Sequence, residues 1–399
     1  MLELANKRVL LGVSGSIAAY KSAELVRLLC KQGAEVRVVM TAAATEFIQP
    51  LTFQALSGNM VYSAWDDADR GDGMGHIELA RWADVIVVAP ASADFLARLR
   101  QGMAGDLLTT LCLASDGTIA VAPAMNRLMW ENAATKENLA VLKQRGIHIL
   151  GPGTGGQACG EVGLGRMLEP EQLARDIPTL FSTGILSGTK LLLTAGPTRE
   201  PIDAMRFLSN RSSGKMGYAL AQAAIEAGAD VTLISGPVAL PSPSRAKRLD
   251  VNSADEMYDA VMSEVAANDV FISAAAVADY RPANPSKEKV KRKDNNVDLA
   301  LTQNRDIVAS VAALPNKPFT VGFAAETCDV EVHARGKLER KGLDLIAANQ
   351  VGEGQGAEVD DNAMTMYWAD GSQHLEKTTK NKLARQMVAI IGEHYRAES

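Results

Sequence analysis

Three segments in the first half of the chain combine residue types that suit ligand binding and catalysis. The turn at residues 12–17 (GVSGSI) offers glycines, hydroxyls and backbone N–H groups just before an expected helix, a favourable place for a phosphate. Because it lacks the full GxGxxG fingerprint, a tight turn without a ligand is an equally good interpretation. Asn126, in PAMNRLMW, follows an expected strand, and ligands of open α/β sheets bind at such strand ends. Its amide suits a carboxylate, with a helix N-cap as the alternative.

Cys159 and His76 are the candidates for proton transfer in this half. Cys159 lies in a glycine-dense segment, residues 155–167 (GGQACGEVGLGRM), which is poorly suited to a helix or strand. We interpret it as a mobile flap that closes over a ligand and presents the thiol. Free cysteines are usually buried packing residues, an interpretation that suits Cys30 and Cys112 better than Cys159. His76, taken alone, is more often a structural residue than a catalytic one.

The second half carries a different set of candidates, rich in cations and small residues. The segment from residue 194 to 217 is dense in Arg, Asn, Ser and Lys before an expected helix, which suits a phosphorylated ligand. Its SSGK quartet lacks the spacing of a P-loop, so that interpretation is rejected. The basic run 287–293 (KEKVKRK) is usually a solvated face, but beside a nucleotide it would supply charge to a triphosphate. Lys337 and Lys341 are spaced to share one face of a helix.

The elements that must position these residues alternate between strand and helix. Continuous apolar runs predict parallel strands buried on both faces, and hence doubly wound α/β sheets. The pattern restarts after a segment rich in small and turn residues, which predicts two domains, 1–189 and 190–399. The strands are expected at 8–13, 35–40, 84–89, 118–122, 148–150, 190–194, 230–234, 269–275, 319–323, 344–348 and 364–368, with helices at 18–32, 219–227 and 380–395.

Composition excludes several classes of function. The chain has 399 residues, of which 47% are hydrophobic and 22% charged. Its net charge of −6 argues against an attraction of the whole protein to nucleic acid and leaves a local basic patch as the alternative, and we expect no nucleic-acid partner. No apolar run approaches the length of a membrane span, and no charged leader is visible, so we expect a cytoplasmic protein. The four cysteines and five histidines are scattered without metal-site spacing, so any metal would be Mg²⁺ arriving with a nucleotide.

Together, the first-half motifs resemble the flavin-dependent cysteine decarboxylase family. The resemblance rests on GSIAAYK, HIEL, PAMNRLMW and ACGEVGLGRM, which occur in the family's order. It implies a flavodoxin-like flavoprotein domain in which His76 is the catalytic base-like residue, Cys159 is the proton donor, and Asn126 with Met129 binds the substrate carboxylate. The FMN contacts that the resemblance implies are Gly15, Ser16, Ile17, Thr41, Ser92 and Asp106.

The second half is similar to the phosphopantothenate–cysteine ligase domain, through AGPTREPID, SNRSSGKMG, AAAVADY, EKVK and VGFAAET. The resemblance implies that Lys289 stabilises charge while an acyl-cytidylate forms and that Asn210 serves its later conversion. One departure, NRDI where a proline often follows the Asn, concerns the contact of Arg305. The implied CTP contacts are Ser273, Ala274, Ala275, Asp279, Lys289, Asn304, Arg305, Asp306, Ile307, Phe323, Lys337 and Lys341.

The order of the two halves resembles the fused bifunctional bacterial enzymes of coenzyme A biosynthesis. This implies ligation of cysteine to 4′-phosphopantothenate with CTP and Mg²⁺, then FMN-dependent decarboxylation of the product to 4′-phosphopantetheine. The family also implies a homo-oligomer, with a trimer-based flavin domain and a dimeric ligase domain. One alternative is a non-catalytic FMN-binding regulatory protein. Another, an NAD-dependent oxidoreductase, predicts an acidic residue at the end of the second strand, where this chain has VVMT.

Overall fold

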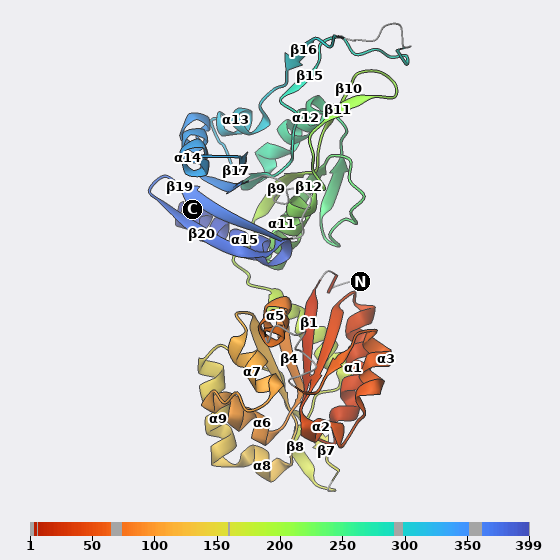
Figure 1. Cartoon of the computed structure of the whole chain (residues 1–399). Helices are drawn as coiled ribbons and strands as arrows, with labels where there is room; N and C mark the ends of the chain where they lie inside the picture. The colour runs from red at the N-terminus through yellow and green to blue at the C-terminus, as the bar shows by residue number, and fades with distance from the viewer. Residues whose placement is uncertain are drawn as a thin grey trace. The chain divides into compact units, whose positions relative to one another are not determined.

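The computed structural model of the chain describes residues 4–5, 7–64, 74–158, 160–290, 298–350 and 361–398 (Figure 1). The chain divides into two compact units, Met1–Phe181 and Ser182–Ser399. Each unit has its own parallel sheet with helices on both faces, so the predicted class of two doubly wound α/β domains is confirmed. In the part of the chain described, no helix combines the length and the apolar character needed to cross a membrane.

The first unit is built on a six-stranded parallel sheet in the order β3-β2-β1-β4-β5-β6. Its central strands are continuous apolar runs because both faces are covered: all seven residues of β4 are buried. The direction of winding reverses between β1 and β4. The strands are β1 (Arg8–Val13), β2 (Glu35–Met40), β3 (Val61–Tyr62), β4 (Val85–Ala91), β5 (Thr118–Pro123) and β6 (His148–Ile149).

Side chains of β1 alternate between two separate cores on the two faces of this sheet. Val9 and Leu11 belong to one apolar cluster, which α1 and α10 complete, and Leu10 belongs to the other, with α6 and α7. The helices are α1 (Ala19–Lys31), α2 (Ala42–Thr45), α3 (Pro50–Ser57), α5 (Gly75–Trp82), α6 (Ala93–Gln101), α7 (Leu107–Ala114), α8 (Arg127–Glu131), α9 (Ala133–Gln144), α10 (Pro170–Asp176) and the 3₁₀ turn η1 (Ile177–Phe181).

The second unit repeats the same winding and adds two strands. Its eight-stranded sheet has the order β13-β12-β9-β14-β17-β18-β19-β20, and β19 and β20 are antiparallel to their neighbours. The six parallel strands follow the order of the first unit, with the reversal between β9 and β14. The strands are β9 (Lys190–Ala195), β12 (Asp230–Ser235), β13 (Lys247–Asp250), β14 (Val270–Ser273), β17 (Phe319–Glu326), β18 (Leu345–Gln350), β19 (Asp361–Trp368) and β20 (Gly371–Thr379).

The second unit also has a core on each face of its sheet. Leu191 and Leu193 pack with α11 and α15, whereas Leu192 packs with α12 and α14. Two short hairpins, β10 (Arg199–Pro201) with β11 (Phe207–Ser209) and β15 (Tyr280–Pro282) with β16 (Leu301–Gln303), extend from strand ends. The helices are α11 (Lys215–Glu226), α12 (Ala254–Glu264), the 3₁₀ turn η2 (Val265–Ala267), α13 (Ile307–Ala312), α14 (Val330–Lys341) and α15 (Lys380–Glu398).

In each sheet an aspartate accepts a hydrogen bond from the backbone of the first strand. The aspartate stands directly before β4 in the first unit and before β14 in the second. Asp84 precedes β4, and its Oδ2 accepts the Arg8 amide N–H at 2.8 Å. Asp269 precedes β14 and accepts the Lys190 amide at 2.8 Å. Asp344 repeats this arrangement before β18 with the Thr320 amide, at 2.7 Å. Each carboxylate satisfies a backbone donor near the amino end of a neighbouring strand.

The predicted strands are all present, with ends shifted by a few residues. One prediction was wrong: the glycine-dense flap contains an antiparallel hairpin, β7 (Gly153–Gly156) with β8 (Val162–Arg166). Glycines suit this hairpin because it lies close to other backbone. A Cβ on Gly165 would come within 2.5 Å of the Met125 carbonyl oxygen.

The segment between the two sheets groups with the second unit from residue 182, whereas the sequence analysis assigned residues up to 189 to the first domain. The reason is packing. Leu186 is fully buried in the second unit's core, and its amide donates to the Ala227 carbonyl at 2.8 Å. Ile185 packs against the same core.

Candidate functional site

The candidate site of the first unit lies at the carboxyl ends of β1 and β4, where the sheet reverses. Ser14, only 2% exposed, joins the loops that leave these two strands. Its hydroxyl donates to the Pro90 carbonyl at 2.8 Å and accepts the Ser92 amide at 2.9 Å. Ser22 on α1 adds a buried hydrogen bond to the Ala89 carbonyl, at 2.6 Å. Ligands of doubly wound sheets bind at this type of switch point.

Several of the predicted FMN contacts lie at helix starts near these strand ends. Thr41, Ser92 and Asp106 are the N-caps of α2, α6 and α7, and their side chains accept amides of the first turn at 3.3, 3.2 and 2.8 Å. Gly15 packs so closely that an added Cβ would lie 2.6 Å from the Ala43 side chain. Helix starts of this kind offer N–H groups to an anion. The individual flavin contacts remain predictions.

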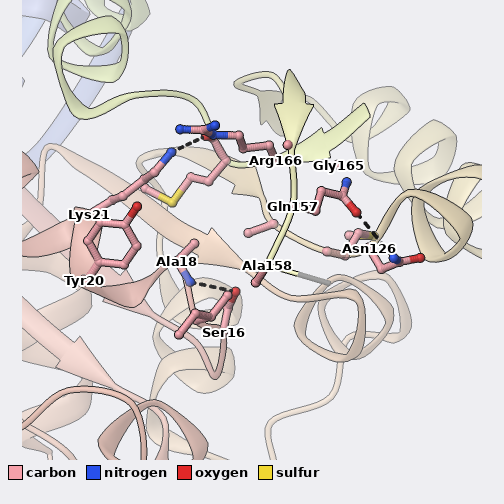
Figure 2. Close-up of a pocket in the computed structure, with 14 residues that line it drawn as sticks. Ser16, Ala18, Tyr20, Lys21, Asn126, Gln157, Ala158, Gly165 and Arg166 are labelled. Atoms are coloured by element: carbon pink, nitrogen blue, oxygen red, sulfur yellow. Dashed lines mark hydrogen bonds between the residues drawn. The ribbon is translucent and has the colours of Figure 1, made fainter. Parts of the chain in front are cut away.

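A cavity of about 580 Å³ opens beside this turn (Figure 2). It brings together two predicted FMN contacts, Ser16 and Ile17, and the predicted substrate residue Asn126. One wall is the β7–β8 hairpin and another is the start of α1. The lining is mainly apolar or glycine: Ser16, Ile17, Ala18, Tyr20, Lys21, Ala124, Met125, Asn126, Gly156, Gln157, Ala158, Gly165, Arg166 and Met167.

Asn126 has a structural role and also faces the hairpin. Its Oδ1 caps α8 by accepting the Leu128 amide at 2.8 Å, so the helix-capping alternative is realised. Its Nδ2 donates to the Glu161 carboxylate at 3.0 Å and lies 3.4 Å from the Gln157 Oε1 (Figure 2). Its predicted role, binding the carboxylate of the substrate, remains a prediction.

Lys21 is a cavity residue that the sequence analysis did not single out. It is 5% exposed, and its Nζ donates to the Met167 carbonyl and to Glu169 Oε1, both at 3.0 Å. The hydrogen bond from Lys21 lowers the pKa of Glu169, against the opposing effect of burial. Lys21 thus joins α1 to the end of the hairpin. Its place at the end of the GSIAAYK motif was the available signal.

Of the predicted first-unit residues that the structure describes, only Ser16, Ile17 and Asn126 line this cavity. His76 is partly buried near the start of α5, and Met129 on α8 is 49% exposed. Neither is among the described residues that line the cavity. Cys159 lies outside the described residues. Nearby, the Gly160 amide donates to the Gln157 carbonyl at 2.9 Å. Among the described residues of a single copy, Asn126 lines the same cavity as the predicted FMN contacts Ser16 and Ile17.

In the second unit, the loops that leave β9 and β14 run side by side at the reversal point. The Thr194 and Thr198 hydroxyls accept the amides of Ala275 and Ala278 at 3.4 and 3.1 Å. Asn210 joins this pair of loops through its Nδ2, which donates to the Val277 carbonyl at 2.9 Å. Two of the predicted residues, Asn210 and Ala275, therefore belong to one strand-end region.

A second group of predicted CTP contacts lies on β17, α13 and α14. Lys337 donates to the Phe323 carbonyl at 2.7 Å, and Lys341 pairs with Asp306 at 2.6 Å. Burial, followed by the charge of Lys341, lowers the pKa of Lys337. Burial opposes ionisation of Asp306, but its hydrogen bonds from Lys341 and the Ala309 amide lower its pKa. Asp279 is close enough to influence Lys337 electrostatically.

The NRDI segment, residues 304–307, buries the side chains of Asn304 and Ile307 and exposes that of Arg305. Asn304 is 8% exposed, and its Nδ2 donates a hydrogen bond to the Ala278 carbonyl at 2.8 Å. Arg305 instead pairs with Asp255 and Asp259 on α12, both at 3.0 Å, and its guanidinium lies over the Tyr258 ring at 3.8 Å. The predicted contact between Arg305 and CTP therefore competes with these three partners. Ile307 is buried in the core at the start of α13.

Lys289 is exposed, in a loop that returns to the turn after β10. The Val290 amide donates to the Asp203 carboxylate at 3.1 Å, and the Ser286 amide donates to the Ile202 carbonyl at 3.0 Å. The sequence analysis quoted Asp203 only as part of a motif. Within the described ranges, no group of three or more His, Cys, Asp and Glu side chains is arranged to hold a metal ion.

Comparisons with known proteins match both units. Residues 2–182 match the family described as Flavoprotein, and residues 186–395 match the DNA/pantothenate metabolism flavoprotein C-terminal domain. The coenzyme A biosynthesis bifunctional protein CoaBC of Vibrio vulnificus (strain CMCP6) is 56% identical over 98% of both chains. The protein of that name from Escherichia coli (strain K12) is 49% identical over 99% of this chain and 98% of its own. Its Bacillus subtilis (strain 168) counterpart is 45% identical over 92% of each.

Proposed function

The chain belongs to the family of coenzyme A biosynthesis bifunctional proteins, and on this premise we propose how its two domains divide the chemistry. The second domain ligates cysteine to 4′-phosphopantothenate with CTP. The first domain decarboxylates the resulting 4′-phosphopantothenoylcysteine to 4′-phosphopantetheine with FMN. The observation that carries the proposal is the contrast between a mainly apolar cavity in the first unit and, in the second unit, a group of lysines that contact a carboxylate and a strand-end carbonyl.

The residues at the first site fit a flavin. The capped starts of α2, α6 and α7 lie near the strand ends, and the apolar cavity suits a planar ring. When bound, FMN supplies reversible two-electron oxidation of the substrate thiol, which gives the electrons left by the departing carboxylate a place to go. The flavoprotein family match over residues 2–182 supports this assignment.

The chain's own residues have four tasks in this reaction. Asn126 holds the substrate carboxylate through Nδ2, the atom that donates to the Glu161 carboxylate at 3.0 Å. The β7–β8 hairpin excludes water from the cavity, and Cys159 gives a proton to the decarboxylated product. His76 is the base-like residue. We propose that it acts in a site completed by a second copy of the chain.

The second site suits the transfer of a cytidylyl group. A carboxylate oxygen of 4′-phosphopantothenate attacks the α-phosphorus of CTP, and pyrophosphate leaves with its Mg²⁺. The cysteine amine then attacks the acyl carbon, loses a proton, and CMP leaves. Lys337 and Lys341 offer positive charge for the nucleotide phosphates, and Lys289 stabilises the negative charge that develops during the first step. Asn210 serves the second step.

We extend the proposal to assembly and location. Ile17 and Tyr20 line the cavity yet are 61% and 62% exposed, which supports coverage by another copy of the chain in a trimer-based flavin domain. The ligase domain is proposed to pair as a dimer. Cys30, Cys112 and Cys328 are all free, in keeping with a cytoplasmic enzyme that acts on small molecules.

An absorbance spectrum of the purified full chain, followed by pyrophosphate release with CTP, 4′-phosphopantothenate and cysteine, tests both halves. A flavin spectrum, pyrophosphate release and formation of 4′-phosphopantetheine are expected. Colourless protein that gains no decarboxylation on addition of FMN would disprove the proposal for the first domain. Yellow protein that neither decarboxylates nor consumes CTP would favour a non-catalytic flavin-binding role.

A further inference from the structure

We propose that Asp203 is a positioning residue for the ligation reaction, and that its carboxylate holds the loop of residues 286–290, with Lys289, beside the strand-end site of the second unit. The inference rests on the proposed role of Lys289. It concerns a residue that contacts neither the phosphates nor the reacting carboxylate in this scheme, and it follows from the partners of one buried group.

The Asp203 carboxylate is fully buried, with a side-chain exposure of 0%. A buried carboxylate is costly unless each oxygen has hydrogen-bond donors. Oδ1 accepts the amides of Met205 and Arg206, each at 2.8 Å. Oδ2 accepts the Arg206 guanidinium, at 3.0 Å from Nε, and the Val290 amide at 3.1 Å. The Val290 amide comes from a distant part of the sequence and links this turn to the basic loop.

The basic loop is attached to this turn on both sides of Lys289. Upstream, the Ser286 amide donates to the Ile202 carbonyl at 3.0 Å. Downstream, Val290 uses both its backbone groups, because its carbonyl accepts the Arg206 Nη2 at 3.2 Å. The exposed residues between these attachments include Lys289. Two attachments four residues apart restrict where its ammonium group reaches.

The turn that carries Asp203 is itself firmly joined to the domain. The Glu200 carboxylate, on a residue that is 1% exposed, accepts the Ala254 amide at the start of α12, at 3.0 Å. The Arg199 amide donates to the Asn252 carbonyl at 2.8 Å. The β10–β11 and β15–β16 hairpins lie side by side in the upper part of Figure 1. Asp203 therefore connects the loop to a turn that is itself hydrogen-bonded to the start of α12 and to the segment before it.

Ionisation of Asp203 is favoured by its surroundings. The hydrogen bond from the Arg206 side chain, and then the Met205 amide, hold the pKa of its carboxyl well below the usual range. The group is therefore an anion at neutral pH. Its neutral isostere, asparagine, would place an NH₂ group against one of these donors and leave an amide without an acceptor.

The test uses Asp203→Asn in the full-length chain, with two readouts. Pyrophosphate release is expected to fall by roughly tenfold to a hundredfold, mainly in kcat, since a charged hydrogen-bond acceptor is lost. Tryptic cleavage after Lys287 in the native protein is expected to become faster by about tenfold, because the loop is released. Decarboxylation of supplied 4′-phosphopantothenoylcysteine should not change. The matched control is Asp250→Asn, which removes an arginine-paired carboxylate whose side chain is 69% exposed, and should alter neither readout.

A second variant keeps the test informative if Asp203→Asn does not fold. Val290→Pro removes the backbone N–H that Asp203 accepts and retains the carboxylate. It should reproduce both the faster cleavage after Lys287 and the loss of pyrophosphate release. Wild-type cleavage and wild-type activity in folded Asp203→Asn would overturn the inference. The protease readout does not depend on Lys289 chemistry, so failure of the proposed function and failure of this inference are distinguishable.

Discussion

The two parallel sheets of this chain share one strand order and one reversal point but hold their strand-end loops in different ways. In the first unit the hydroxyls of Ser14 and Ser22 bind carbonyls at the carboxyl end of β4. In the second, the hydroxyls of Thr194 and Thr198 join the loops that leave β9 and β14. The buried carboxylates of Glu200 and Asp203 add attachments to the start of α12 and to the loop at Val290. The cavity beside these neutral hydrogen bonds is lined mainly by apolar residues and glycine, which suits a planar ring. Buried carboxylates, with lysines nearby, produce an ionic site that suits a nucleotide triphosphate.

The parts of the two sheets that determine the winding are equivalent. Asp84 and Asp269 precede corresponding strands and accept the amides of Arg8 and Lys190, each at 2.8 Å. The chemical difference therefore lies in the loops, as is usual when one scaffold carries different reactions. If the loops set the chemistry, a change in one unit should leave the activity of the other unit unchanged.

The largest expected effect is that of Lys289→Gln. Loss of the ammonium group should lower pyrophosphate release by at least about a hundredfold, because the developing charge of the acyl-cytidylate step loses its partner. Decarboxylation of supplied 4′-phosphopantothenoylcysteine should remain at the wild-type rate. Both rates are measured on the same preparation. Loss of both activities would contradict the independence of the two sites.

A matched pair of core substitutions tests independence at the level of folding. Leu11→Ala in β1 and Leu193→Ala in β9 each remove a fully buried side chain. Each should destabilise its own unit by about 2–5 kcal/mol, and calorimetry should show one transition lowered in each variant. A shift of both transitions by either substitution would show that the two units unfold together.

Ser14→Ala tests the neutral attachment of the first site. It leaves the Pro90 carbonyl and the Ser92 amide without their buried partner, so the first unit should lose about 1–3 kcal/mol of stability. FMN should dissociate faster, as followed by the recovery of flavin fluorescence on dilution. Ser22→Ala, which loses a single buried hydrogen bond and does not touch Ser92, is the control and should retain FMN better. Equal rates of FMN dissociation in the two variants would contradict a specific role of Ser14 in holding the FMN site.

The lowered pKa of Lys337 predicts a pH dependence in the second site only. Because burial favours the neutral amine, the ammonium is lost as pH rises through a value below that of an ordinary lysine. Below that value the buried charge reduces stability, and the cost disappears as pH rises. KM for CTP should therefore increase several-fold between about pH 7 and about pH 10. In Lys337→Arg the profile should be flatter, since a guanidinium stays protonated.

The smallest effect is expected for Arg305→Gln. Its guanidinium is already engaged by Asp255, Asp259 and the Tyr258 ring, so KM for CTP should change by less than about threefold. An increase of tenfold or more would show that Arg305 leaves these partners to bind the nucleotide, as the family resemblance implies. Steady-state kinetics with CTP as the varied substrate distinguish the two results.

Local sequence patterns predicted much of this fold. The apolar runs around Leu11, Val87 and Leu193 marked buried parallel strands, and glycine and hydroxyl residues after them marked the strand-end loops. The hairpin of β7 and β8 was not predicted, because its stability comes from contacts such as Gly165 against the Met125 backbone rather than from β-propensity. The antiparallel β20 was missed for a similar reason: its burial pattern is mostly exposed.

By itself, the sequence determined which segments are buried strands and which chemical groups stand at their ends, since both follow from periodicity within a few residues. Tertiary structure alone decided which of these groups meet. Asp203 and Val290 are 87 residues apart, and Lys21 and Met167 are 146 apart. Such pairs depend on the order of strands in a sheet, which is set by the packing of whole elements on two faces and leaves no local pattern in the chain.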